Sequence, residues 1–294
     1  MKLIAFVLFG LPATVAAQDP LASHDASARH AVAAFLDYDA SVPLHADVVS
    51  IDRALGFTRE KVVLTGGARD RVPGLLALPD GVGPFPVVLL LHAGAGTKDT
   101  WWEPDGLERG SALTEGLLDA GYAVFALDGE HHGERAGSVG YVPITTWYFE
   151  HEWWATFRSM VAETVTDYRR VLDYMETRSD LDVSAVGVVG VSMGGITAVA
   201  LASVDSRVNT IVSASAALTP EWLFPLTHPN LAPTLSGRRV LTIVGDNDEL
   251  VQVSSAERFH ESLSTDSKVL HVYEGGHRPP VEWISLAVDW IAGR

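Results

Sequence analysis

Residues 186–204 read VGVVGVSMGGITAVALASV, an apolar run that passes through Gly190-Val191-Ser192-Met193-Gly194 into an alanine-rich stretch. The apolar run predicts a buried strand, and the alanine-rich stretch predicts a helix. A G-x-S-x-G motif between a strand and a helix is typical of a tight turn that exposes a nucleophilic serine. We therefore predict Ser192 as a nucleophile. The competing interpretation is a glycine-rich turn whose serine only caps the helix.

Similar patterns alternate along the rest of the chain. Uninterrupted apolar runs are typical of strands buried on both faces of a parallel sheet, and the stretches between them have helical character. We predict a single α/β domain over residues 18–294, with a mostly parallel central sheet, helices on both faces and a small lid-like insertion. The expected strands are Lys61–Thr65, Val72–Leu78, Val87–Leu91, Tyr122–Leu127, Ala185–Val191, Val208–Val212, Val240–Val244 and Lys268–Tyr273. The expected helices are Ala28–Tyr38, Leu107–Ala120, Trp153–Arg178, Met193–Val204, Val253–Leu263 and Val281–Ile291.

One segment interrupts the alternation. Residues Glu130 to Trp154 are rich in glycine and aromatic residues and have no clear period. Long loops in compact domains often serve as lids or binding loops. The sequence leaves open whether this segment is a lid or an ordinary packed excursion on the surface.

A serine nucleophile needs a base to take its proton, and the base needs an acid to orient it. His277 follows the last expected strand in a glycine-rich loop, and we predict it as the base. The strand that ends at Val244 is followed by Gly245-Asp246-Asn247-Asp248, so the acid is either Asp246 or Asp248. Activity should fall at low pH because the base must be neutral.

Backbone N–H groups that bind the oxyanion of a tetrahedral intermediate can also be predicted from the motifs. The residue after the nucleophile supplies one N–H, and the loop after an early strand supplies the other. These are Met193 and, in the loop after the Val87–Leu91 run, Gly94 or Ala95. We expect His92 in the same loop to hold the loop in place rather than to react.

Four further motifs accompany these residues: VPGLLALP at 72–79, DGEHHGER at 128–135, GDND at 245–248 and GH at 276–277. Together they resemble the α/β-hydrolase superfamily, and within it the dienelactone-hydrolase-like and esterase members, over about residues 61–290. The resemblance implies the α/β-hydrolase fold, and its G-x-x-D acid loop implies Asp248 as the acid. Ser192 stands where dienelactone hydrolases usually carry cysteine. His92-Ala93-Gly94 replaces the His-Gly-Gly of many lipases and esterases.

The expected activity is that of a serine hydrolase which cleaves a small-molecule carboxylic ester through an acyl-enzyme, with no metal or organic cofactor. The same three residues could also serve a peptidase or amidase, because a triad does not distinguish esters from amides. A non-catalytic binding protein on a hydrolase scaffold is the alternative from another class.

Composition and the N-terminal residues limit the classes of binding partner and the cellular compartment that we expect. The formal net charge of −16 disfavours nucleic acid and anionic membranes as partners. The chain has no cysteine, which excludes disulfides and thiol catalysis. Lys2, the apolar run Leu3–Leu11 and the small residues Val15–Ala17 predict a cleaved signal peptide at residues 1–17, and hence a secreted or periplasmic protein. No later run predicts a membrane span, and the sequence does not indicate an oligomeric state.

Two other groups of residues raise the question of binding. We predict that Trp101, Trp102 and Trp154 line a substrate pocket, with core packing as the competing interpretation for tryptophans at strand ends; Trp147, Trp153 and Trp222 raise the same question. The cluster Glu130, His131, His132 and Glu134 could suggest a metal, but its spacing matches no common ligand set, so we expect it to hold the loop instead.

Overall fold

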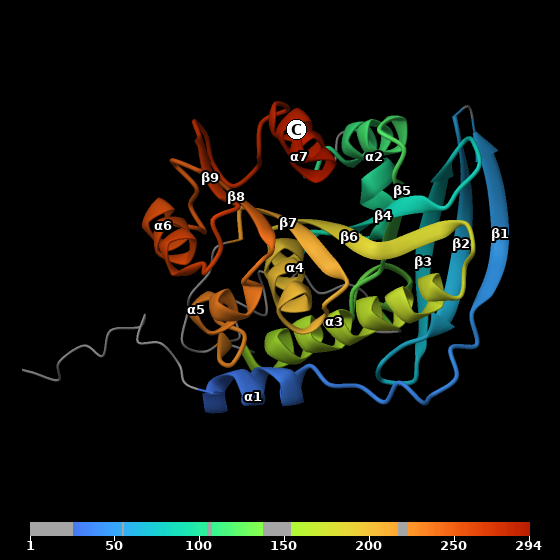
Figure 1. Cartoon of the computed structure of the whole chain (residues 1–294), viewed down its shortest axis with the longest axis horizontal. Coiled ribbons are helices and arrows are strands. Elements are labelled where there is room, and N and C mark those ends of the chain that lie inside the picture. Colours follow the sequence, from blue (N-terminus) through green and yellow to red (C-terminus); the bar gives the residue numbers. More distant parts are fainter. Residues whose placement is uncertain (1–25, 55, 105–107, 138–153, 217–222) are drawn as a thin grey trace, which may run out of the picture.

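The computed structural model describes residues 26–54, 56–104, 108–137, 154–216 and 223–294 (Figure 1). The predicted signal peptide lies outside these residues. The strands are β1 (Asp47–Ala54), β2 (Phe57–Thr65), β3 (Arg71–Pro79), β4 (Phe85–Leu91), β5 (Ala123–Leu127), β6 (Leu181–Val191), β7 (Val208–Ala214), β8 (Arg239–Gly245) and β9 (Lys268–Tyr273). The α-helices are α1 (Ala26–Phe35), α2 (Gly110–Asp119), α3 (Trp154–Glu176), α4 (Met193–Val204), α5 (His228–Leu231), α6 (Val253–Ser262) and α7 (Trp283–Ala292).

The strands form one sheet in the order β1-β2-β3-β5-β4-β6-β7-β8-β9. β1, β2, β3 and β5 pair antiparallel with one another in that order. All pairings from β5 through β4, β6, β7 and β8 to β9 are parallel. This arrangement confirms the predicted mostly parallel sheet, and it places the carboxyl ends of the parallel strands at one edge.

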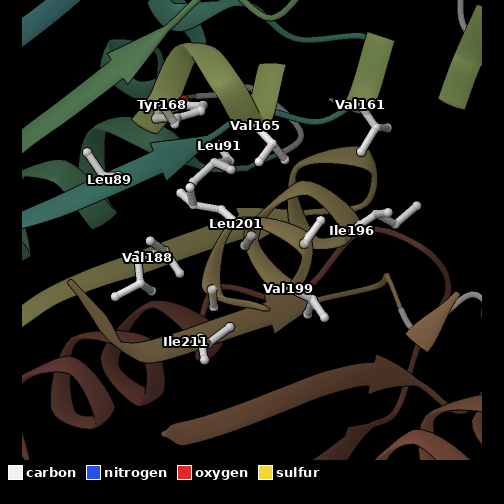
Figure 2. Close-up of a cluster of buried hydrophobic side chains, with 14 of the residues drawn as sticks. Leu89, Leu91, Val161, Val165, Tyr168, Val188, Ile196, Val199, Leu201 and Ile211 are labelled. Carbon is white, nitrogen blue, oxygen red and sulfur yellow. The ribbon is translucent and has the colours of Figure 1, made fainter. Parts of the chain in front are cut away.

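Side chains of each central strand alternate between two cores. Leu89 and Leu91 of β4 contribute to a core on one face, whereas Val88 and Leu90 contribute to a core on the other face. The first core includes side chains of α3 and α4, and Figure 2 shows Val161, Val165, Ile196 and Val199 of these helices in one cluster with strand residues such as Val188 and Ile211. α2 and α7 cover the opposite face (Figure 1). Helices on both faces are therefore confirmed.

β1 is the one strand of the described residues that the sequence did not predict. It is an edge strand, and its apolar residues Val48, Val49 and Ile51 are exposed. A β-bulge interrupts its pairing between Val48 and Ser50. Its sequence therefore has neither the uninterrupted apolar run of a central strand nor a regular alternation. None of the helices in the described part of the chain has the length and apolar character needed to cross a bilayer.

Within α5, the side chain of His228 is buried without a hydrogen-bond partner on either ring nitrogen, and its ring lies 4.5 Å from that of Phe259 between centroids. Burial lowers the pKa of His228 to about 3. In the folded protein His228 stays neutral down to about pH 3, whereas in the unfolded chain it is protonated below about pH 6.5. The contribution of His228 to the free energy of unfolding therefore decreases as pH falls from that value toward 3.

We predict that His228→Leu reduces this acid sensitivity by roughly 1 kcal/mol for each pH unit below 6.5. Urea unfolding at several pH values between 7 and 4 measures the slope in both proteins. The control is His271→Leu, because His271 is exposed on β9. Equal slopes in wild type and His228→Leu would contradict the prediction.

Candidate active site

Ser192 occupies the turn between β6 and α4 with φ 54° and ψ −119°, a backbone conformation that L-residues rarely adopt. Its N–H donates to the Ala214 carbonyl at 2.8 Å, and its carbonyl accepts from Gly195 N–H at 2.9 Å. A Cβ added to Gly190 would overlap the Gly194 carbonyl, and one added to Gly194 would overlap the Leu91 carbonyl. The two glycines of the motif are thus required by close approach of backbone, and they bring the start of α4 against the end of β4.

The loops after β8 and β9 bring two more predicted residues to Ser192. His277 Nε2 lies 2.9 Å from Ser192 Oγ, and His277 Nδ1 lies 3.0 Å from both carboxylate oxygens of Asp248. Asp248 Oδ1 also accepts from the N–H groups of Leu250 and Val251, each at 2.9 Å. The structure therefore brings the serine, the imidazole and the carboxylate into one chain of hydrogen bonds.

Asp246, the other candidate acid, has a different position. Its side chain is exposed, and its Oδ1 accepts from the N–H of Gly275 at 2.9 Å and from Asn247 Nδ2 at 2.8 Å. These bonds tie the loop after β8 to the loop after β9. Asp246 thus supports the loop that carries His277, whereas Asp248 contacts the imidazole itself.

The loop after β4 lies beside the first turn of α4. A Cβ on Gly194 would also meet the His92 carbonyl at 2.7 Å, so this loop and the backbone around Met193 are neighbours. Gly94 is buried and Ala95 is exposed. The predicted oxyanion donors therefore lie in adjacent segments, and their roles remain predictions.

His92 is buried and hydrogen-bonded through both ring nitrogens. Its Nδ1 lies 2.8 Å from the Ala93 carbonyl oxygen, and its Nε2 accepts from the N–H of Gly129 at 2.9 Å. Burial, with the charge of His132 as a smaller cause, lowers the pKa of His92 to about 3. A neutral His92 thus joins the loop after β4 to the loop after β5, as expected of a residue that holds the loop.

Lys98 and Asp128 form a buried ion pair that no motif in the sequence predicted. Lys98 Nζ donates to Asp128 Oδ2 at 2.8 Å, and the backbone N–H of Lys98 donates to Oδ1 at 2.9 Å. The Lys98 side chain is only 3% exposed and also reaches Glu134 at 2.8 Å. Burial alone would lower the pKa of Lys98, but the bonds to Asp128 and Glu134 outweigh burial and raise it. The pair fixes the loop after β4 to the carboxyl end of β5.

The cluster of Glu130, His132 and Glu134, which could have suggested a metal site, contacts protein groups instead. His132 contacts the carbonyl oxygens of Gly94 and Glu130. Glu134 accepts from Lys61 and Lys98, and Glu130 accepts from Arg135. In the portions of the chain that the structure describes, no group of three or more potential ligands could hold a metal ion. The contacts of His132, Glu130 and Glu134 hold the loops after β4 and β5 together.

The predicted pocket tryptophans have three different environments. Trp101 is 0% exposed and packs in the core beside α2, where Thr114 Oγ1 donates to its carbonyl, so it is a core residue and does not line an open pocket. Trp102 is half-buried, with the guanidinium of Arg59 lying 5.6 Å from its ring centroid. Trp154, at the start of α3, is 36% exposed. Trp147, Trp153, Trp222 and most of the candidate lid lie outside the described residues.

Comparison with known proteins identifies a family of hydrolases and a related hydrolase sequence. The model of the dienelactone hydrolase family matches residues 72–277. The chain is 24% identical over 246 residues to the putative hydrolase YtaP of Bacillus subtilis (strain 168), which covers 76% of this chain and 80% of that protein.

Solved esterase structures are similar in fold. Acetyl xylan esterase 1 from Thermoanaerobacterium sp. JW/SL YS485 superimposes with a TM-score of 0.70 at 18% identity, over 91% of this chain and 93% of that one. A cold-adapted esterase from an Arctic intertidal metagenomic library gives 0.66 at 23% identity, over 84% and 97%. These similarities confirm the predicted α/β-hydrolase fold.

The buried ion pair generates a prediction about stability. Lys98→Met would leave Asp128, which is 0% exposed, without its cation, and should lower the free energy of unfolding by about 3–5 kcal/mol. Lys61→Met removes the more exposed cation on Glu134 and should cost less than about 1 kcal/mol. Urea unfolding of both variants measures the difference. Equal losses would show that the buried pair has no special role.

Proposed function

The chain belongs to the dienelactone hydrolase family and is an ester hydrolase, and on that premise we propose that it cleaves carboxylic esters through an acyl-enzyme on Ser192. One observation carries the proposal: the Ser192 hydroxyl lies 2.9 Å from an imidazole nitrogen whose ring is held from its other nitrogen by Asp248. Nucleophile, base and orienting acid within hydrogen-bonding distance are what this chemistry requires.

The proposed reaction has two halves. Ser192 Oγ attacks the ester carbonyl while His277 Nε2 takes its proton, and a tetrahedral intermediate forms. When the intermediate collapses, the C–O bond to the alcohol breaks and His277 gives the proton to the leaving oxygen. His277 then deprotonates a water molecule that attacks the acyl-enzyme. The carboxylic acid leaves as the proton returns to Ser192 Oγ.

Asp248 and backbone N–H groups stabilise the two charges that develop during the reaction, on the imidazole and on the substrate oxygen. The Asp248 carboxylate holds Nδ1–H of His277 and stabilises the imidazolium that forms in each half of the reaction. We assign the oxyanion to the N–H of Met193 and an N–H of the loop after β4, at Gly94 or Ala95. The start of α4 adds the positive end of a helix at the same place.

Apolar surface at this edge of the sheet suggests the substrate class. Trp154, Phe224, Leu250 and Val281 are exposed, and they lie on segments that follow β5, β7, β8 and β9 respectively. Loops at the carboxyl ends of parallel strands share one edge, which also carries Ser192. We propose a neutral ester with an apolar acyl or alcohol group, since the net charge of −16 disfavours anionic substrates.

The function predicts that Ser192→Ala lowers kcat on nitrophenyl esters by at least about 10⁴-fold. A panel of acyl lengths, assayed beside nitroanilide amides, measures activity and substrate class together. Wild-type hydrolysis in Ser192→Ala would overturn the proposed nucleophile. Uniformly weak ester turnover with efficient amide turnover would favour a peptidase or amidase.

A matched pair of variants tests the acid. Asp248→Asn should lower kcat by about 10³- to 10⁴-fold, because an amide does not stabilise the imidazolium. Asp246→Asn should retain most of the activity, since its amide oxygen can still accept from Gly275 N–H. Steady-state kinetics on one nitrophenyl ester compares the two. A larger loss in Asp246→Asn would reverse the assignment.

A further inference from the structure

The loop after β4 forms a β-turn from Ala93 to Gly96, closed by the Gly96 N–H donating to the Ala93 carbonyl at 2.8 Å. Gly94 and Ala95 are its central residues, and neither has a positive φ. Turns of types II, I′ and II′ each need a positive φ at a central residue, so this turn has type I geometry. Its central peptide carries the Gly94 carbonyl and the Ala95 N–H.

The two groups of that peptide point in opposite directions, because a trans peptide is planar. Whatever holds the Gly94 carbonyl therefore also sets the direction of the Ala95 N–H. The same reasoning applies one peptide earlier: the Ala93 carbonyl contacts His92 Nδ1 at 2.8 Å, which sets the direction of the Gly94 N–H.

His132 contacts the Gly94 carbonyl. Its Nε2 lies 2.9 Å from that oxygen, and its Nδ1 lies 2.8 Å from the Glu130 carbonyl oxygen. Carbonyl oxygens only accept, so the ring nitrogen that binds the Gly94 carbonyl carries a hydrogen. The His132 side chain is buried at 2% exposed, and its ring lies against that of His92, with 4.9 Å between centroids.

The backbone beside His132 has an unusual conformation. His131 and Gly133 have φ of 63° and 51°, so the chain enters and leaves His132 through left-handed positions. Asp128, which anchors this loop, accepts from the N–H of Glu134 at 3.0 Å and from Lys98. Strained positions persist only where surrounding contacts hold them. The loop after β5 therefore directs one imidazole at the oxyanion turn.

We propose that His132 is a positioning residue, which fixes the direction of the Ala95 N–H toward the oxyanion by binding the Gly94 carbonyl on the opposite side of the peptide. This inference rests on the proposed function. Rotation of the central peptide converts a type I turn into type II and reverses the N–H. Apart from His132, the methyl group of Ala95 opposes this rotation, since type II requires a positive φ at that residue.

Two substitutions at His132 separate positioning from general support. The amide nitrogen of glutamine can reach the place of imidazole Nε2, whereas that of asparagine reaches only the place of Nδ1. His132→Gln thus keeps the Gly94 contact, and His132→Asn keeps the Glu130 contact and loses the other. We predict that kcat on a nitrophenyl ester falls about 10- to 100-fold in His132→Asn with little change in KM, and that His132→Gln restores kcat to within about threefold of wild type.

A transition-state analogue provides a second readout. The inhibition constant of an aryl trifluoromethyl ketone, whose adduct with the serine carries an oxyanion, should rise in His132→Asn by the same factor as kcat falls. Thermal unfolding of each variant identifies a loss of fold. If His132→Asn does not fold, His132→Ala, which deletes the contact without adding a polar group, takes its place with the same expectation.

Two results would overturn the proposal. One is wild-type kcat and inhibition in His132→Asn or His132→Ala. The other is an equal loss of kcat in the asparagine and glutamine variants that follows their loss of thermal stability, as expected of a residue that only supports the fold. Failure of the proposed function is a separate outcome, because it appears as ester hydrolysis that persists in Ser192→Ala.

Discussion

The backbone of Ser192 is the constraint on which the site depends. Its positive φ turns the chain sharply from β6 into α4, and the turn closes only because Gly190 and Gly194 have no side chains. The hydroxyl is thereby presented at the carboxyl edge of the parallel strands. The same close approach brings the start of α4 against the end of β4, so the nucleophile and the oxyanion loop are positioned by a single packing contact.

Rigid connections between loops then complete the site. Asp246 joins the loops after β8 and β9, which carry Asp248 and His277. On the other side of Ser192, the Lys98–Asp128 pair and the neutral His92 join the loops after β4 and β5. The bonds of Asp128 and His92 are buried, where polar groups are costly to leave unpaired. The electrostatic groups of the site are therefore held before any substrate arrives.

The elements that could be predicted from the sequence are those determined by residues close together in the chain. The apolar runs of β4 and β6 indicate burial on both faces, and the glycines around Ser192 indicate a tight turn. His277 and the two aspartates could be found because each follows a strand that the sequence predicts. The choice between Asp246 and Asp248 came from resemblance to a family, since local sequence does not show which carboxylate faces the imidazole.

Features that depend on distant contacts were missed or misjudged. β1 was not predicted because its apolar residues are exposed at the edge of the sheet. Trp101 follows a strand, as a pocket residue would, but it is buried in the core beside α2. The pairing of Lys98 with Asp128, and of His132 with Gly94, joins residues about 30 to 40 positions apart, and no spacing rule in the sequence indicates either contact.

The proposed chemistry requires the hydroxyl of Ser192, on the turn after β6, to become a covalent nucleophile. Reaction of the wild-type protein with a fluorophosphonate, followed by peptide mapping by mass spectrometry, tests it most directly. One adduct is expected, on the side chain of Ser192, formed in step with the loss of ester hydrolysis. Full loss of hydrolysis with the adduct on a different residue, or full labelling of Ser192 with hydrolysis unchanged, would contradict it.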